Sequence, residues 1–146
     1  MNKSIFALII MITLACSAQK TAKNEENNSF LQVLEQDAYF YTQNPTSFVI
    51  NNQNALNLFY SKVNRTRKPG LSVPIIDFKK EVVLIACMGK QKDVELPELI
   101  VLKEDSTTIT IGMEISSKKN RLPIISYPFC VYKMPRTKKE IVFKTL

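Results

Sequence analysis

The strongest constraint on the fold is the apolar run VVLIACMG at residues 82–89. A strand that exposes one face to water alternates apolar and polar residues, whereas this run is apolar at almost every position. We therefore expect it to be a central strand of a sheet. A single core commonly takes about 100 to 150 residues, so the 146 residues of the chain predict one domain built around this strand.

Further strands are expected before and after this run. The segment STTITIGMEIS alternates, so that Ile109, Ile111, Met113 and Ile115 would share one face, and the polar stretch KEDST predicts a hairpin. Residues 30–40 fit a short helix or a strand equally well. The other expected strands are TSFVI (46–50), ELIVLKED (98–105), PFCVYKMP (128–135) and, at an edge, EIVFKTL (140–146).

One helix is expected at residues 53–63. Its apolar residues recur at three- and four-residue spacing, and Asn51 and Asn52 supply side chains that can cap its start. The fold class is therefore α+β and mostly β, an antiparallel sheet forming a small sandwich or open barrel with one packed helix. The apolar face of the helix consists of Ala55, Leu56, Phe59, Tyr60 and Val63.

Residues 1–15 have the pattern of a secretory signal peptide. Lys3 provides the positive charge, Ile5–Leu14 form the apolar run, and Ala15 is the small residue before a cut. This run is too short for a transmembrane helix, which needs about 20 apolar residues.

The tripeptide Leu14-Ala15-Cys16 resembles the lipobox of bacterial lipoproteins, although Thr13 stands where that motif usually has leucine. The resemblance implies that Cys16 is acylated and becomes the first residue of the mature protein. Ordinary signal-peptidase cleavage, which would leave Cys16 as a free thiol, is the alternative. Residues 16–29 are polar and aperiodic, which predicts a flexible tether between the lipid anchor and a single domain at residues 30–146.

This organisation predicts a protein in the cell envelope of a diderm bacterium. The lipid anchor would hold it on a membrane, facing the periplasm or the cell surface. The formal net charge of +7 would otherwise suggest a nucleic-acid partner, but export makes that class of partner unexpected.

The remaining cysteines, Cys87 and Cys130, permit two interpretations. They form an even pair in a compartment where disulfides persist, so they could be bonded to each other. Each also lies in an apolar strand, where cysteine is often a small buried hydrophobe. Two cysteines in a chain without histidine do not make a structural zinc site.

The side-chain inventory does not favour catalysis. Without histidine, the commonest general base is missing, and a serine or cysteine nucleophile would need lysine or a carboxylate as its base. The Ser-Lys neighbours at 61–62 and 116–119 lie in polar, surface-like segments. Asp93, Glu95 and Glu98 lack the pattern of a known calcium loop. We therefore expect neither enzyme activity, nor a metal site, nor a cofactor.

Basic residues gather in two parts of the chain. They could lie against anionic headgroups or an acidic partner, but the simpler interpretation, which we favour, is a solvated surface. We expect Asp77 and Glu81 to pair with Lys79, Lys80 or solvent. The two basic clusters are Arg65, Arg67 and Lys68, and Lys118, Lys119, Arg121, Lys133, Arg136, Lys138, Lys139 and Lys144.

Residues from about Ser47 to Lys144 resemble the C-terminal domain of PrcB-type protease-complex subunits, a family of small exported bacterial domains. The resemblance depends on the order and spacing of a helix before Pro74, the segments PIIDF and KKEVVLIACMG, a pair of strands around residues 109–113, and YPFCVYKMP. The matching motif positions are Asp77, Phe78, Gly89, Pro128, Phe129, Lys133, Met134 and Pro135.

The chain departs from this family after Gly89. Members usually continue with a Thr-Gly-Gly-Tyr turn, whereas this chain has KQKDVELPE at residues 90–98. A Gly-Gly turn permits positive φ and a close approach of the backbone to a partner. If that turn makes contacts in the family, the charged loop must replace them here through Lys90, Lys92, Asp93 and Glu95.

The resemblance implies a non-catalytic accessory module that binds an exported peptidase or another envelope protein. A peptidase inhibitor is the second hypothesis, because glycine-rich loops on small β domains can block protease clefts, but the missing turn counts against it. A structural or ligand-binding envelope lipoprotein is the third.

Overall fold

The computed structural model describes residues 30–92, 94–115 and 124–145. Strands are the commonest secondary structure of the described chain, and the main helix follows the second strand. In chain order the elements are β1 (Gln32–Asp37), β2 (Thr46–Ile50), α2 (Gln53–Val63), the 3-10 helix η1 (Asn64–Thr66), β3 (Glu81–Cys87), β4 (Pro97–Glu104), β5 (Thr108–Ile115), β6 (Phe129–Pro135) and β7 (Glu140–Thr145).

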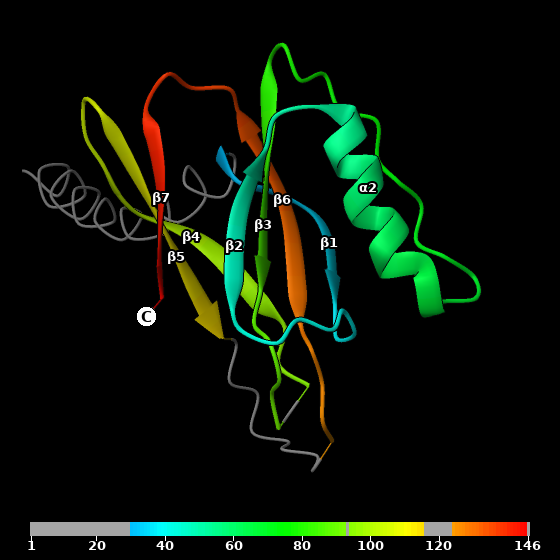
Figure 1. Ribbon diagram of the computed structural model, residues 1–146. Coiled ribbons are helices and arrows are strands. Elements are labelled where there is room, and N and C mark those ends of the chain that lie inside the picture. Colours follow the sequence, from blue (N-terminus) through cyan, green and yellow to red (C-terminus); the bar gives the residue numbers. More distant parts are fainter. Residues whose placement is uncertain (1–29, 93, 116–123, 146) are drawn as a thin grey trace, which may run out of the picture.

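The strands form two sheets that make a three-layer arrangement with α2 (Figure 1). A four-stranded sheet has the order β1-β6-β3-β2, and a three-stranded sheet has the order β4-β5-β7. Helix α2 packs on one face of the four-stranded sheet, and the three-stranded sheet covers the other. The predicted class, α+β and mostly β with a sandwich and one packed helix, is confirmed.

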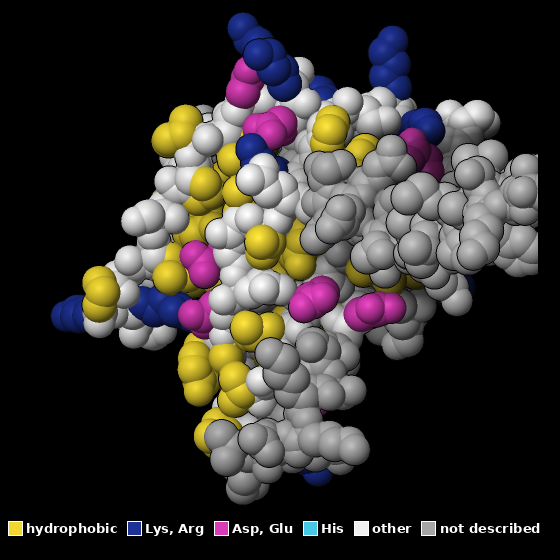
Figure 2. Space-filling view, turned by 180° about the vertical axis from the view of Figure 1, so that it is seen from behind, with side chains coloured by type: hydrophobic (Ala, Val, Ile, Leu, Met, Phe, Trp, Pro, Cys, Tyr) yellow, Lys and Arg dark blue, Asp and Glu magenta, His cyan; other side chains and the backbone are white. Residues whose placement is uncertain are grey.

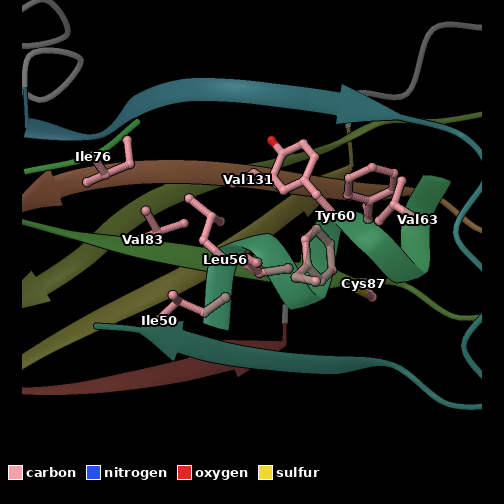
Figure 3. Close-up of a cluster of buried hydrophobic side chains, with 11 residues drawn as sticks. Ile50, Leu56, Tyr60, Val63, Ile76, Val83, Cys87 and Val131 are labelled. Atoms are coloured by element: carbon pink, nitrogen blue, oxygen red, sulfur yellow. The ribbon is translucent and has the colours of Figure 1, made fainter. Parts of the chain in front are cut away.

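Strand β3 is central, as its composition predicts, because both of its faces are buried. Alternate residues Val83, Ile85 and Cys87 point toward α2, and none of them is exposed to solvent. Figure 3 shows Leu56, Tyr60 and Val63 of the helix above Val83 and Val131 of β3 and β6. The intervening residues Val82, Leu84 and Ala86 pack toward the second sheet. An uninterrupted apolar sequence is what a strand covered on both faces requires.

The second core fills the space between the two sheets. Ile109 and Ile111 of β5 are buried there, with Met113 packed against them, so the predicted inward face is confirmed at these three positions. Gln36 of β1 also donates a hydrogen bond from Nε2 to the carbonyl of Pro97, at 2.8 Å, which connects the sheets at one edge.

Helix α2 begins and ends where its sequence predicts. The Asn52 side chain accepts a hydrogen bond from the amide of Ala55 at 2.8 Å, which satisfies one of the free N–H groups of the first turn. Leu56, Phe59, Tyr60 and Val63 are buried against the sheet. Residues 30–40, which fitted two interpretations, contain strand β1.

One strand pairing differs from the predicted antiparallel arrangement. Strand β7 is the edge strand that the sequence predicts, but it pairs with β5 in parallel, with Ile109 opposite Ile141 and Ile111 opposite Phe143. The reason is topological. The chain enters β7 from β6 of the other sheet, so it is not a hairpin return from β5, and a crossover of this kind permits the parallel direction.

The connection between β4 and β5 is the predicted hairpin. The Asp105 carboxylate accepts hydrogen bonds from the amides of Thr107 and Thr108, each at 2.9 Å. These bonds hold the pKa of Asp105 below its ordinary value. A short Asx-type turn therefore closes the hairpin with its own side chain.

Candidate functional site

A groove of about 440 Å³ lies between strand β2 and helix α2, and we call it the β2–α2 groove. Its strand wall includes Phe48 and Ile50, and its helix wall includes Ala55, Leu58 and Phe59. In Figure 1 both elements lie on the near side of the molecule. Its volume lies within the range of about 300 to 1,000 Å³ that is common for ligand sites. The complete lining is Phe40, Thr42, Thr46, Phe48, Val49, Ile50, Ala55, Leu58, Phe59 and Lys62.

The floor of the groove is rigid because aromatic rings support it from below. Phe59 makes edge contacts with Phe40, Phe48 and Phe129, with ring centroids 5.1, 6.1 and 5.8 Å apart. Such edge-to-face pairs add about 0.5 to 1.5 kcal/mol each beyond their buried area. The groove is thus a preformed apolar surface and not a gap that could easily collapse.

Apolar side chains remain exposed on both walls. Leu58 of α2 is 58% exposed, and Phe48 of β2 is 36% exposed. A helix of a soluble domain normally turns its polar face outward, so a leucine at position 58 interrupts that face. A contiguous apolar surface of this kind is typical of an interaction site.

A second cavity of about 310 Å³ adjoins the groove at Phe40 and Lys62, which line both. We call it the tyrosine cavity, because Tyr39 and Tyr41 form one wall and are 56% and 70% exposed. Tyr41 packs against Tyr127, with ring centroids 5.0 Å apart. Arg65 is part of the opposite wall.

The charged residues that line the two cavities are both positive. Neither Lys62 nor Arg65 has an ion pair or a side-chain hydrogen bond with any described residue, and no acid lines either cavity. The place where the cavities join is therefore suited to an anionic group.

Strand β2 also leaves one edge of its sheet without a partner strand among the described residues. It pairs with β3 from Thr46 opposite Cys87 to Ile50 opposite Val83. On its other side no hydrogen bond to a described residue is formed, and Thr46 and residues 48–50 of the same strand line the β2–α2 groove. An open edge of this kind is a template for an added strand.

The motif positions of the family resemblance lie at the two ends of the β3–β6 pair. At one end, Arg136 donates to the Phe78 carbonyl at 2.7 Å, and Asp77 accepts from the amide of Lys79 at 3.1 Å. Pro135 lies there too, opposite Glu81. These contacts hold the start of β3 next to the end of β6, so the role of these residues is structural.

The other end of the pair contains Gly89, Pro128 and Phe129. Gly89 has φ of +68°, and an added Cβ would lie 3.1 Å from the backbone of Asn44 and Pro45. The Met88 amide donates to the Pro128 carbonyl at 2.9 Å. Phe129 is fully buried and supports the groove floor. Of the motif positions, Phe129 is thus the one that contacts a candidate site.

The charged loop after Gly89 does not form part of either cavity. Lys90 and Lys92 are exposed, Glu95 is half-buried, and Asp93 lies outside the described residues. Gln91 anchors the loop, with its amide donating to the Ser126 carbonyl at 2.9 Å. The three described charges are thus available at the surface near the end of β3, separate from the β2–α2 groove.

Of the two interpretations that the sequence permits for Cys87 and Cys130, the structure contains the pair of buried hydrophobes and not the disulfide. Both thiols are free and fully buried. The register places Ala86 opposite Cys130, so the two cysteines are displaced by one residue. Side chains alternate across a strand, so Cys87 faces α2 while Cys130 faces the second sheet. Burial raises the pKa of each thiol to about 12.

Several basic residues of the predicted clusters stabilise the fold. Arg67 pairs with Asp37, and Lys133 pairs with Glu81 at 2.8 Å. The expectation that Glu81 pairs with Lys79, Lys80 or solvent is therefore wrong, because the neighbouring strand brings Lys133 to it. Lys139 pairs with Glu104 at 2.6 Å. Lys80 approaches Asp77 at 3.7 Å in the solvent, as the sequence predicts. Lys118, Lys119 and Arg121 lie outside the described residues.

Figure 2 shows the molecule from behind the view of Figure 1. Lys and Arg side chains stand mainly at its margins, and acidic side chains are scattered among hydrophobic ones. In this view the described Lys and Arg side chains do not form a continuous basic face.

Catalytic and metal-binding constellations do not assemble among the described residues. No group of three acidic or cysteine side chains is close enough to hold a metal within residues 30–92, 94–115 and 124–145. Ser61 donates its hydroxyl to the Leu58 carbonyl at 2.8 Å on an exposed turn of α2. The second Ser-Lys neighbourhood, at 116–119, lies outside the described residues, as does Cys16.

Comparisons of this chain with protein-family models, curated proteins and solved structures found no match. The resemblance to PrcB-type domains therefore stays a prediction. Within the part of the chain that the structure describes, no helix has the length and apolar character needed to cross a bilayer.

Sequence reasoning did not identify the β2–α2 groove. The periodicity of α2 shows its buried stripe, but Leu58 lies beside that stripe and resembles one more core residue. The signal that could have identified the groove is the extra leucine of the helix together with Phe48 in the preceding strand. Their shared exposure depends on strand order, which is a tertiary property.

Proposed function

We propose that this protein is a non-catalytic, lipid-anchored envelope protein that binds another protein as an accessory module of an exported peptidase or envelope complex. The observation on which the proposal depends is the β2–α2 groove, a supported apolar surface beside an open strand edge. The lipobox at Cys16 and the polar tether at residues 16–29 support the location.

The local chemistry supports binding over catalysis. The thiols of Cys87 and Cys130 have pKa values of about 12, so they remain protonated at neutral pH and are poor nucleophiles. Lys62 and Arg65 are suited to attract an anion, but no carboxylate, cysteine or serine is among the described residues that line the cavities with them. What the cavities provide is apolar area and positive charge.

The shape of the site supports docking over peptidase inhibition. An inhibitor of a peptidase usually inserts a projecting loop into a cleft, whereas the β2–α2 groove is itself concave. The Gly89 backbone packs against Asn44 and Pro45 and is thus held inside the fold. The groove would receive a segment of a partner.

The location is tested with a Cys16→Ala variant of the full chain. Wild-type protein should acquire a lipid label and sediment with membranes, whereas the variant should stay unlabelled and leave the membrane fraction. Labelling of the variant, or its retention in the membrane without acylation, would contradict the lipid anchor.

The binding function is tested by affinity purification from gently solubilised membranes, followed by mass spectrometry and a peptide-hydrolysis assay. We expect a near-stoichiometric envelope protein, and if it is a peptidase, its activity should be unchanged or higher with this protein bound. Abolition of activity at equal stoichiometry would instead identify an inhibitor. Elution of the protein alone would refute both functions.

A further inference from the structure

We propose that the β2–α2 groove binds the C-terminal segment of a partner protein as an additional strand antiparallel to β2. In this arrangement the last apolar side chain of the partner enters the groove, and its terminal carboxylate lies near Lys62 and Arg65. The inference rests on the proposed protein-binding function and specifies the ligand of that site.

The open edge of β2 requires an extended ligand. In an antiparallel ladder, about half of the N–H and C=O groups of an edge strand point away from its neighbour. For Thr46–Ile50 these groups have no hydrogen-bond partner among the described residues. A peptide in extended conformation can pair with them, which is the principle of recognition by β-strand addition.

The groove beside this edge has room for an apolar side chain. Alternate side chains of an added strand would point toward the wall formed by Leu58, Ala55 and Phe59. A volume of about 440 Å³ exceeds that of one leucine or phenylalanine side chain, so part of the peptide backbone also fits. Burying such a side chain contributes about 1.5 to 3 kcal/mol.

The connection between β2 and α2 sets the direction of the ligand. Only Asn51 and Asn52 separate the two elements, and α2 runs back in roughly the opposite direction to the strand (Figure 1). The end of α2 with Lys62 therefore lies beside Thr46, and both residues line the groove. A strand antiparallel to β2 has its carboxyl end at this point.

Positive charge at this end favours a carboxylate. Lys62 and Arg65 have no acidic partner among the described residues. The last carbonyls of α2 have partial negative charge and would repel an anion. Lys62 and Arg65 are therefore what makes this end attractive, and removal of the Lys62 charge should affect binding strongly.

One buried hydroxyl also lacks a partner. The Oγ1 atom of Thr42 lines the groove, is inaccessible to solvent and makes no hydrogen bond. Buried polar atoms are nearly always paired, and because water does not reach this one, a bound peptide group would pair with it only after the Thr42 side chain turns toward the groove.

The test measures fluorescence anisotropy of labelled hexapeptides with the full chain. The probes have the sequence Gly-Ser-Thr-Val-Thr followed by Leu or Phe, each with a free carboxylate. We expect saturable binding that becomes at least tenfold weaker when the carboxylate is amidated or the last residue is replaced by Ser. Methylation of alternate backbone amides should abolish binding for one of the two alternations, because only those amides pair with β2.

Matched variants locate the binding site. Lys62→Glu and Leu58→Asp should each weaken binding at least tenfold. Lys79→Glu and Ile75→Asp are controls, because Lys79 is an exposed lysine in the turn before β3 and Ile75 is 87% exposed away from the groove. The controls should change affinity less than twofold, and circular dichroism should show that all four variants are folded.

Three results would overturn the inference: no binding of any probe, equal binding of carboxylate and amide peptides, or binding of a fluorescent fatty acid without binding of peptides. If a partner still co-purifies and Leu58→Asp does not release it, the groove inference fails while the proposed protein-binding function stands. If no partner co-purifies at all, the proposed function fails.

Discussion

The ion pair between Asp37 and Arg67 leads to the most quantitative prediction. Arg67 follows η1 and reaches the end of β1, where Nη1 donates to Asp37 Oδ2 at 2.9 Å and Nη2 to Oδ1. Nη2 also donates to the Tyr39 carbonyl at 3.0 Å. The exposed fractions of the two side chains are 18% for Arg67 and 22% for Asp37. This contact holds the wall of the tyrosine cavity in place.

The expected magnitude follows from this burial. Breaking a fully buried pair costs about 3 to 5 kcal/mol, whereas an exposed pair contributes about 0.2 to 1 kcal/mol. A two-pronged pair that is mostly, but not fully, buried should lie between these ranges. We expect Asp37→Asn to lower the free energy of unfolding by about 2 kcal/mol.

A double-mutant cycle isolates the pair. The variants Asp37→Asn and Arg67→Met, alone and combined, are unfolded with urea and followed by circular dichroism. The coupling energy should be about 1 to 2 kcal/mol after allowance for partial solvent screening. Asp77→Asn with Lys80→Met is the matched control, because that pair is exposed and 3.7 Å apart, and its coupling should be near zero.

The pH dependence provides an independent check. Burial by itself would raise the pKa of Asp37, but the hydrogen bonds and charge of Arg67 and the backbone amides outweigh it and hold the pKa below 3.8. The folded-state pKa is thus below the unfolded one. The contribution of ionised Asp37 to the free energy of unfolding is fully present above the pKa of Asp37 in the unfolded chain. It is lost as the pH falls through the pKa of Asp37 in the folded protein. The stability difference between wild type and Asp37→Asn should shrink as the pH is lowered from 5 toward 2. A coupling energy below about 0.3 kcal/mol, or a difference that does not change with pH, would refute this reasoning.

Three further predictions concern the core and its turns. Cys87 and Cys130 should react with a thiol reagent at least about 1,000-fold more slowly in the native than in the unfolded protein at pH 8, because pKa values of about 12 leave little thiolate. The reaction is followed by absorbance in the Cys16→Ala variant, which lacks the third thiol, and fast labelling of this variant in its native state would contradict the prediction. Leu56→Ala should lower the free energy of unfolding by about 3 kcal/mol, because Leu56 is fully buried. Leu58→Ala should change it by less than about 0.5 kcal/mol, because Leu58 is exposed. Similar urea midpoints for the two variants would show that the burial pattern is wrong. Gly89→Ala should cost about 1 to 3 kcal/mol, because φ is +68° and the new Cβ would crowd Asn44 and Pro45; an unchanged melting temperature would disprove the strain.

Local patterns were sufficient for most of the secondary structure. The alternation in β5 and the spacing in α2 each reflect one face of one element, and such periodicities are visible in a short window. The Asn52 cap and the Asp105 turn are also local, because each joins groups within three residues. For residues 30–40 the window did not distinguish helix from strand, and pairing of β1 with β6 decided it.

The candidate site could not be predicted in the same way. The residues singled out for the family resemblance, such as Asp77 and Gly89, have mainly structural tasks at the ends of β3. Arg67, grouped with surface cations by sequence, is engaged by Asp37, 30 positions earlier. Leu58 and Phe48, by contrast, resemble ordinary core residues until the fold shows them exposed beside an open strand edge.

The amino-acid sequence by itself determined which segments after β1 become strands and helix, that β3 is central, and where the hairpin turns, because these follow from side-chain periodicity and local hydrogen bonding. Only the tertiary structure decided the parallel pairing of β7, the opposite directions of Cys87 and Cys130, and the open edge of β2 beside α2. These features depend on strand order and register. Both are set by packing energies summed over distant segments, which no local pattern contains.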